Sequence, residues 1–345
     1  MEGQRSELPR VSIILPCYNE EQEIRTAIRE VQKQTFGGRE IIVVDDGSTD
    51  ETAPIAEEYC VGHPDTRVIR IAHSGLTHVR NVGIRESKGE IIFFAESDCV
   101  YDADYVEKAV QCLDAQPDAN AVCLTGGPLK VRSTLATECI EIENVVQHKL
   151  LAQGKIKPFY AWVFRRAQLV AIGGFDERLF QGEDKDVFRR FVNAGNKVAW
   201  LPGIHWRHKR DQTTWQLAQK WFFRGRSRVL YAVKHGLMKD FAKTLLPFWL
   251  LVFGLLYLLV LPIVGVILIA LVLALFVGNT IRIARIAWSS LSNRRYLLGY
   301  PFFLMVRNFS SALGYMWGLI TPYTYSAGMR DANASSKLVE EFSEA

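Results

Sequence analysis

The sequence predicts an α/β fold with a mostly parallel sheet, followed by a C-terminal helical membrane region. Three observations support this prediction. Along residues 11–201, short apolar runs alternate with helix-period segments, as in a doubly wound sheet. Several of these runs end in acidic side chains. Residues 244–281 contain no charged residue, and a membrane helix needs about 20 apolar residues.

The expected strands and helices follow from the apolar pattern. Short apolar runs that follow turn residues are typical of strands buried on both faces of a parallel sheet. They predict strands at residues 11–15, 41–44, 68–71, 91–95, 119–124, 161–164 and 198–201. Helix-period segments predict helices at residues 24–31, 77–87, 135–151 and 187–194, with another after residue 50. The carboxyl ends of the parallel strands then form one edge of the sheet.

The strand at residues 91–95 ends in two carboxylates, Glu96 and Asp98. In open α/β sheets ligands bind beyond the carboxyl ends of the strands, which is where these side chains stand. Two carboxylates suit a hard cation such as Mg²⁺ or Mn²⁺, which in turn holds a diphosphate. The alternative is a polar turn that caps the next helix.

Two other strand ends bring polar side chains to the same edge. Tyr18, Asn19 and Glu20 follow the first strand, and Asp45 and Asp46 follow the second. Neither a G-x-G-x-x-G motif nor a P-loop occurs, so the sequence does not predict a phosphate cradle of backbone N–H groups. Carboxylates suit the donors of a base and a ribose. This edge therefore predicts a nucleotide site whose diphosphate is neutralised by a cation.

The composition narrows the class of protein. The 345 residues carry a formal charge of +4, which is too mild to indicate nucleic-acid binding. The six cysteines are scattered without the spacing of a zinc site, and we interpret them as reduced thiols of a cytosolic domain. Residues 1–10 are polar and lack the apolar core of a signal peptide.

Six short motifs occur in order along residues 11–201. They are Pro16–Glu20 (PCYNE), Val44–Asp50 (VDDGSTD), Arg80–Gly83 (RNVG), Glu96–Asp98 (ESD), Gly173–Glu177 (GGFDE) and Gly182–Asp184 (GED). With these motifs the region resembles the catalytic domain of family 2 glycosyltransferases. The resemblance implies a Rossmann-like GT-A fold that transfers sugars from nucleotide-diphospho-sugars with inversion. The C-terminal part is similar to that of membrane-anchored members that build exopolysaccharides and lipid-linked glycans.

The resemblance assigns donor contacts to the first two strand ends. It implies that Pro16, Tyr18 and Glu20 line the base and the ribose. It also implies that Asp46 accepts a hydrogen bond from the ring N–H of the base, while Asp45 supports the turn. A UDP-sugar is the favoured donor.

The resemblance also implies a divalent cation, Mn²⁺ or Mg²⁺, as cofactor. Asp98 matches the metal-binding aspartate of the D-x-D motif, and Arg80 is expected to approach the nucleotide. Glu96 departs from the family, which usually has aspartate there, although its longer side chain still reaches the ribose or the cation. His205 is a candidate third ligand, and the alternative is a hydrogen-bonding histidine at the domain edge.

Asp184 matches the catalytic base of the family, with Glu183 in support. In a single inverting displacement the acceptor hydroxyl loses its proton while the nucleotide diphosphate leaves, so a carboxylate within reach of that proton is needed. The alternative is that both acids cap the helix that starts near Asp186, because acids favour a helix N-terminus. Both roles are compatible.

A basic, aromatic stretch precedes the apolar region. On a helix, Lys220, Arg224 and Arg228 share one face. For these residues and Arg226 two interpretations stay open: attraction to anionic lipid head groups, or a grip on the phosphate of a lipid-linked acceptor or of the donor. Trp162 is interpreted as a core aromatic that faces the acceptor side of the predicted fold.

Residues 244–281 predict a membrane hairpin. The run has no polar stripe, and Pro262 near its middle predicts two short helices joined by a turn. A third apolar segment, residues 297–320, carries Arg307 and Asn308, so it is either buried against the hairpin or lies in the interface. Basic residues flank the hairpin on both sides, which places these flanks and the catalytic domain in the cytoplasm.

The expected division of the chain is linear. It comprises a GT-A domain (1–205), interfacial helices (206–243), a transmembrane hairpin (244–281), a linker with a third membrane or interfacial helix (282–323) and a polar tail (324–345). The expected function is a metal-dependent inverting hexosyltransferase that acts on a lipid-linked glycan or another membrane-borne hydroxyl. The alternative is a polyprenyl-phosphate glycosyltransferase with a phosphate acceptor. A non-catalytic sugar-nucleotide binder fits less well, because the acidic motif and Asp184 are both present.

Overall fold

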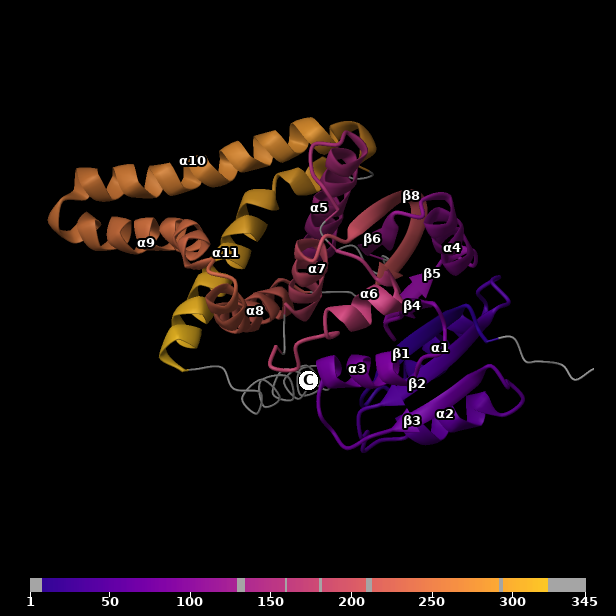
Figure 1. Ribbon diagram of the computed structural model, residues 1–345. Coiled ribbons are helices and arrows are strands. Elements are labelled where there is room, and N and C mark those ends of the chain that lie inside the picture. Colours follow the sequence, from indigo (N-terminus) through magenta and orange to yellow (C-terminus); the bar gives the residue numbers. More distant parts are fainter. Residues whose placement is uncertain are drawn as a thin grey trace, which may run out of the picture. The chain divides into compact units, whose positions relative to one another are not determined.

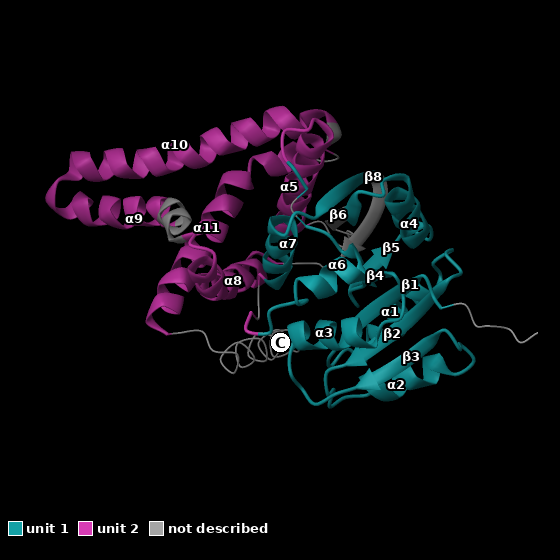
Figure 2. Cartoon of the chain, viewed as in Figure 1, with its two compact units in different colours: residues 1–129, 157–177, 183–209 teal, residues 130–156, 178–182, 210–345 magenta. Residues whose placement is uncertain are grey.

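The computed structural model describes residues 8–128, 134–158, 160–179, 182–208, 213–291 and 294–321. The chain divides into two compact units (Figure 2). Unit 1 comprises Met1–Leu129, Lys157–Glu177 and Glu183–Lys209, and unit 2 comprises Lys130–Ile156, Arg178–Gly182 and Arg210–Ala345. The predicted polar tail, residues 324–345, lies outside the described residues.

Unit 1 is built on one mixed sheet with strand order β3-β2-β1-β4-β7-β6-β8-β5 (Figure 1). The strands are β1 (Val11–Cys17), β2 (Arg39–Asp45), β3 (Thr66–Arg70), β4 (Ile91–Phe94), β5 (Cys99–Tyr101), β6 (Ala119–Pro128), β7 (Val163–Arg165) and β8 (Lys197–His208). The pairs β1–β2, β2–β3, β1–β4 and β6–β8 are parallel, which confirms a mostly parallel sheet. The pairs β4–β7, β5–β8 and β6–β7 are antiparallel.

Helices cover both faces of this sheet. They are α1 (Ile24–Gln32), α2 (Thr52–Cys60), α3 (Leu76–Glu86), α4 (Tyr105–Ala115), α6 (Arg166–Ala171) and α7 (Glu183–Asn193). Successive strand residues point to opposite faces, so Ile13 packs in the cluster with α1 and α4 while Ile14 packs in the cluster with α3 and α7. Both side chains are fully buried. Burial on both faces explains why the strands are continuous apolar runs.

The structure differs from the sequence prediction at several elements of unit 1, among them the unpredicted helices α4 and α6. Strand β5 was not predicted, because three residues after an acidic turn carry no periodic signal; it forms by antiparallel pairing with β8. Strand β8 continues to His208 rather than ending at residue 201. Helix α7 begins at Glu183, one turn before the predicted start, since its first turn is acidic rather than apolar.

Unit 2 is helical. It contains α5 (Leu135–Ala152), α8 (Thr214–Lys234), α9 (Met238–Val260), α10 (Pro262–Ala287), two short 3-10 turns (Trp288–Ser290 and Arg294–Leu297) and α11 (Tyr300–Ile320). Its core joins Ile142 of α5 with Leu217 of α8, Phe276 of α10 and Phe303 of α11. Helix α5 therefore belongs to this unit, and the linear division at residue 205 does not coincide with the compact units.

Helices α9 and α10 form an antiparallel hairpin (Figure 1). Helix α9 ends before Leu261, and Pro262 is the first residue of α10, where its missing N–H is not needed. The two helices approach closely, since a Cβ at Gly265 would lie 2.7 Å from the carbonyl oxygen of Gly254. In the described part of the chain, α10 is the one helix long and apolar enough to cross a membrane, and Leu245–Val260 is a shorter apolar stretch.

Candidate active site

Arg80 of α3 lies at the centre of the candidate site. It is almost fully buried, with its guanidinium carbon 4.9 Å from the ring centre of Trp162 and 5.2 Å from that of Phe175. Its Nη1 donates to Oε1 of Glu183 at 3.0 Å, and its Nη2 lies 3.7 Å from Oε1 of Glu96. One buried cation thus connects the end of β4 with the start of α7.

The approach of α3 to the sheet depends on a glycine. A Cβ at Gly83 would lie 2.4 Å from Cγ2 of Ile14 in β1, so no larger residue fits without a shift. Arg80 and Asn81 lie one turn earlier on the same helix. The RNVG motif therefore combines two functional side chains with the glycine that lets their helix sit against the strand.

Asn81 fixes the turn formed by the GGFDE motif. Its Nδ2 donates to the carbonyl oxygen of Phe175 at 2.9 Å and to Oε1 of Glu177 at 2.8 Å, and its Oδ1 accepts from the backbone N–H of Phe175 at 2.9 Å. Gly174 has φ of +64°, and a Cβ there would lie 2.6 Å from Oδ1 of Asn81. Glycine is needed at this position for both reasons.

Arg190 holds α7 against the same turn. Its Nε donates to Oδ2 of the fully buried Asp186 at 2.8 Å, while Nη1 and Nη2 donate to the carbonyl oxygens of Ile172 and Gly174 at 2.7 and 2.6 Å. The first turn of α7, which carries Glu183 and Asp184, is therefore fixed relative to the GGFDE turn. Neither Arg190 nor Asp186 was predicted as a site residue.

The two acids at the start of α7 have different environments. The side chain of Glu183 is 13% exposed and bonded to Arg80. Burial and the neighbouring Asp184 charge raise the pKa of Glu183, while Arg80 opposes the shift. Asp184 is half-buried, and its Oδ1 accepts from the backbone N–H of Lys185 at 2.7 Å. Glu183 is thus engaged by Arg80, and the role of Asp184 as a base stays a prediction.

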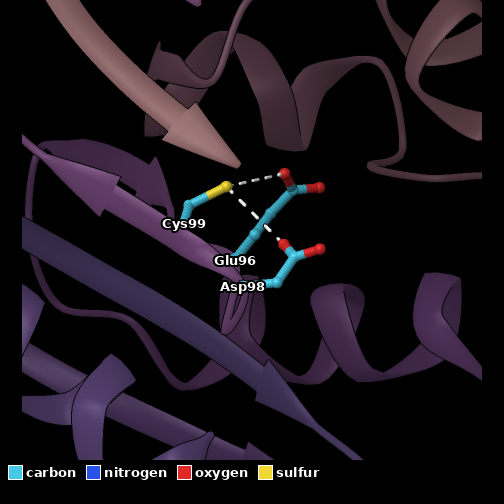
Figure 3. Close-up of side chains that lie close together, drawn as sticks. All are labelled: Glu96, Asp98 and Cys99. Atoms are coloured by element: carbon cyan, nitrogen blue, oxygen red, sulfur yellow. Dashed lines mark hydrogen bonds between the residues drawn. The ribbon is translucent and has the colours of Figure 1, made fainter. Parts of the chain in front are cut away.

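Glu96, Asp98 and Cys99 form a compact cluster at the end of β4. One potential ligand atom from each lies within 4.8 Å of the others. Figure 3 shows both carboxylates close to the sulfur, and the Cys99 thiol donates to Oε2 of Glu96 at 3.4 Å and to Oδ1 of Asp98 at 3.6 Å. Burial and the two carboxylates raise the pKa of Cys99, so the thiol is neutral in the metal-free chain.

This donor set fits a hard divalent cation. Mn²⁺ and Mg²⁺ prefer carboxylate oxygens, and the cluster offers two carboxylates beside a protonated thiol. Glu96 and Asp98 were predicted as ligands, whereas Cys99 was not, because one cysteine next to an aspartate carries no signal of its own. The side chain of His205 lies outside the described residues, although its backbone pairs with Thr125, so its role as a third ligand stays a prediction.

The loops after β1 and β2 are bonded to each other. The backbone N–H of Asn19 donates to Oγ of Ser48 at 2.9 Å, and Oδ1 of Asn19 accepts from the N–H of Thr49 at 2.9 Å. The N–H of Glu20 donates to Oγ1 of Thr52 at 2.6 Å. Asn19 has φ of +50°, a conformation that asparagine tolerates better than most residues. These hydrogen bonds connect the PCYNE and VDDGSTD motifs, which the sequence assigns to the nucleotide.

Tyr18 and His73 form a stacked pair at this edge. Their ring centres are 4.0 Å apart, with an interplanar angle of 16°. Asp46 holds the His73 loop, because Oδ1 accepts from the N–H of Ser74 at 2.7 Å and Oδ2 from that of Gly75 at 2.8 Å. Oδ2 also lies 2.9 Å from Nδ1 of His73. Sequence reasoning missed His73, and the predicted contact of Asp46 with a base stays a prediction.

The other predicted donor residues lie around the same strand ends. Asp45 is fully buried and accepts from the N–H of Ser48 at 3.4 and 3.3 Å, which fits the expected support of the turn. Pro16 and Glu20 are partly buried at the end of β1. Trp162 lies close to Phe93, Phe94, Glu96, Tyr101 and Tyr105. Its ring covers Arg80, and its role toward an acceptor stays a prediction.

The predicted phosphate-binding residues belong to α8 in unit 2. Arg224 and Arg228 both lie against Trp221, and Lys220 is partly buried on the same helix. Arg226 is 8% exposed, in the interface of α8 with α11. Arg226 thus lies off the predicted face of Lys220, Arg224 and Arg228, whose binding of a phosphate stays a prediction.

Comparisons with known proteins agree with this architecture. The putative glycosyltransferase EpsH of Bacillus subtilis is 34% identical over 174 residues, which cover 48% of this chain and 49% of EpsH. The glycosyltransferase AglE of Haloferax volcanii is 26% identical over 206 residues, covering 58% and 66% of the two chains. The chain thus spans about half to two thirds of the length of these relatives.

A solved structure shares the fold. The mannosyltransferase PcManGT from Pyrobaculum calidifontis, in complex with GDP-Man and Mn²⁺, superposes with a TM-score of 0.57 at 18% identity, covering 90% of this chain and 88% of that one. This likeness confirms the predicted GT-A fold. The family model described as glycosyl transferase family 2 matches residues 12–166, which include the strand ends, Arg80 and the Glu96–Asp98 cluster but not Asp184. On this match, residues 12–166 are a glycosyl transferase family 2 domain.

Proposed function

We propose that the chain transfers a sugar from a nucleotide-diphospho-sugar to a membrane-borne hydroxyl acceptor with inversion of configuration. The observation that carries this proposal is the link through Arg80 between the Glu96–Asp98 cluster and the acidic start of α7. It brings a cation site and a candidate base into one rigid arrangement. The family 2 domain supports the transferase class.

The proposed reaction is a single displacement. The acceptor oxygen bonds to the anomeric carbon while the bond from that carbon to the diphosphate breaks, and Asp184 takes the acceptor proton. Glu96 and Asp98 would hold a divalent cation, which when bound neutralises the charge of the leaving diphosphate. Glu183 and Arg80 hold the first turn of α7 in place.

The donor and the acceptor are assigned by chemistry. The stacked Tyr18 and His73 offer an aromatic surface at the edge that the sequence assigns to the base. A UDP-sugar is our first choice of donor, and a GDP-sugar is the second because the related fold of PcManGT was solved with GDP-Man. The apolar α10 favours an acceptor at a membrane, such as a lipid-linked glycan, with unit 1 on the cytoplasmic side.

A polyprenyl phosphate is the second candidate acceptor. The arginines beside Trp221 favour it, because guanidinium groups recognise phosphate. Such an acceptor is already ionised at neutral pH and needs no strong base. Asp184 would then serve to position the substrates.

A donor screen tests the proposed function. The purified chain in neutral detergent is incubated with UDP- and GDP-sugars and a membrane lipid extract, and release of nucleotide diphosphate is measured with Mn²⁺ or with excess chelator. We expect release from one donor, dependent on the lipid extract and on the cation, and its loss in Asp98→Asn. Release that stays at the parent's Mn²⁺ level both in excess chelator and in Asp98→Asn would contradict the metal-assisted transfer.

A further inference from the structure

Three arginines from two helices converge on one tryptophan in unit 2. The guanidinium carbons of Arg224 and Arg228 each lie 5.2 Å from the ring centre of Trp221, and that of Arg307 in α11 lies 5.6 Å from it. Arg224 and Arg228 are one helical turn apart and share the face of α8 that carries Trp221. The sequence pattern indicated the two α8 arginines, whereas it marked Arg307 only as a charge within an apolar segment.

Arg307 is held in this position by fixed partners. Its Nη1 donates to Oε1 of Glu143 in α5, and the hydroxyl of Tyr300 donates to the same carboxylate oxygen at 3.1 Å. The guanidinium carbon also lies 5.7 Å from the ring centre of Phe303. The charge in the middle of α11 is therefore anchored by α5 and remains partly accessible, with 22% of its side chain exposed.

Helices α8 and α11, which carry the arginines, pack with their backbones in contact. A Cβ at Gly314 of α11 would lie 1.9 Å from the carbonyl oxygen of Phe222, and one at Gly225 of α8 would lie 2.2 Å from that of Ser311. Glycines at both positions let the two backbones touch. The spacing between Arg307 and the α8 arginines is thus set by the fold before any ligand binds.

At least one charge of this group, that of Arg228, has no carboxylate partner among the described residues. Like charges one turn apart on a helix repel. Elsewhere in unit 2, Arg294 rests on Trp288 with a centroid distance of 4.7 Å as a single arginine–tryptophan pair. The group around Trp221 differs by gathering three guanidinium groups, whose planar forks match the oxygens of a phosphate.

We propose that Arg224, Arg228 and Arg307 form a binding site for the phosphate or diphosphate of a membrane lipid. Trp221 supports the three guanidinium groups, and Glu143 orients one of them. That this phosphate belongs to the sugar acceptor rests on the proposed function, whereas the anion site itself rests on the geometry alone. Arg226, buried in the interface with α11, is not part of the site.

Binding of inorganic pyrophosphate tests the anion site without any donor. The full chain in neutral detergent is titrated by calorimetry in excess chelator, so that no cation supports binding at the Glu96–Asp98 cluster. Arg228→Gln and Arg224→Gln each remove a charge-assisted contact, and we expect affinity to fall roughly tenfold or more. Arg228→Lys should lose less, and Arg294→Gln should bind like the parent chain. Equal affinity in the parent, Arg224→Gln and Arg228→Gln would overturn the proposal.

Vesicle binding distinguishes the sources of the phosphate. Phosphatidylcholine vesicles that carry a small fraction of polyprenyl phosphate, phosphatidic acid or phosphatidylserine are floated with each variant. We expect the two phosphate monoesters to recruit the parent chain more strongly than phosphatidylserine, and Arg224→Gln and Arg228→Gln to lose this difference. Equal recruitment by all three lipids would overturn the lipid assignment. So would a chain that binds soluble pyrophosphate but does not prefer vesicles carrying a phosphate monoester. Asp98→Asn should lose sugar transfer but keep this lipid binding. The proposed function and the anion site can therefore fail independently.

Discussion

Nη1 of Arg80 donates to Oε1 of Glu183 at 3.0 Å, and this bond joins a helix buried against the sheet to the helix that presents Asp184. Nη2 of the same guanidinium faces Glu96. Arg80 was expected to approach the nucleotide, yet it lies between two aromatic rings and two carboxylates. We therefore interpret it as a positioning residue that neutralises the site rather than as a donor ligand.

Arg80→Met should destabilise the chain more at pH 8 than at pH 5. The pKa of Glu183 is raised in the folded state, so Glu183 adds to the free energy of unfolding when it is protonated. This contribution is complete at a pH below the pKa of the unfolded chain, and it is lost as the pH rises through the pKa of the folded chain. Without Arg80 that pKa rises further and the loss grows. Breaking a buried pair costs roughly 3–5 kcal/mol. Unfolding midpoints at both pH values measure the effect, with Arg80→Lys as the charge-preserving control. An equal loss at both pH values would rule out this role.

Mn²⁺ binding should depend on the two carboxylates and not on the thiol. Asp98→Ala should abolish binding, and Glu96→Asp should retain more affinity than Glu96→Ala because the carboxylate remains. Cys99→Ser should bind like the parent, since Mn²⁺ prefers carboxylate oxygens to sulfur. Calorimetric titration with Mn²⁺ gives the affinities. Strong loss of binding in Cys99→Ser alone would show that the sulfur is a ligand.

Gly83→Ala should lower both stability and activity. The added Cβ would lie 2.4 Å from Ile14, and overpacking of this kind costs about 1–3 kcal/mol. The shift of α3 also moves Arg80 and Asn81, so kcat should fall with Tm. Gly37→Ala is the matched control, because no atom lies within 4 Å of its added Cβ. If Gly83→Ala lowers Tm but leaves kcat unchanged, the position of α3 does not affect catalysis and the prediction is contradicted.

A chain that ends at residue 243 should aggregate rather than yield a soluble catalytic domain. It keeps the sheet but loses α10 and α11, which bury Ile142 of α5 and Leu217 of α8. Those apolar surfaces would then face water. Sedimentation after extraction in neutral detergent measures the outcome, and a chain that ends at residue 321 is the control because it retains all the described helices. A monodisperse 1–243 protein would contradict the shared helical core.

Much of the fold was predictable because its strands are buried on both faces. The runs that contain Ile13, Ile42 and Phe93 have no polar alternation, which is the signature of a parallel sheet. The acidic strand ends followed from the same reasoning. Each of these features is local in the sequence, so a pattern can reveal it.

The features that sequence reasoning missed depend on contacts between distant segments. His73 becomes relevant through its stacking on Tyr18. Cys99 is an exception, because its two carboxylate partners are close in sequence. Arg307 reaches Trp221 only because glycines let α8 and α11 touch. Helix α5 lies between sheet segments in the sequence but packs with the C-terminal helices, which no periodicity indicates.

The most direct test of the proposed function is the turnover of Asp184→Asn, measured with saturating donor and acceptor beside the affinity for the donor. The amide oxygen of asparagine still accepts from the N–H of Lys185, so the start of α7 is preserved. General-base catalysis typically contributes 10²–10⁴-fold, and we expect kcat to fall by about that factor while the Kd of the donor stays the same. An Asp184→Asn chain that turns over as fast as the parent would contradict the assignment of Asp184 as the base.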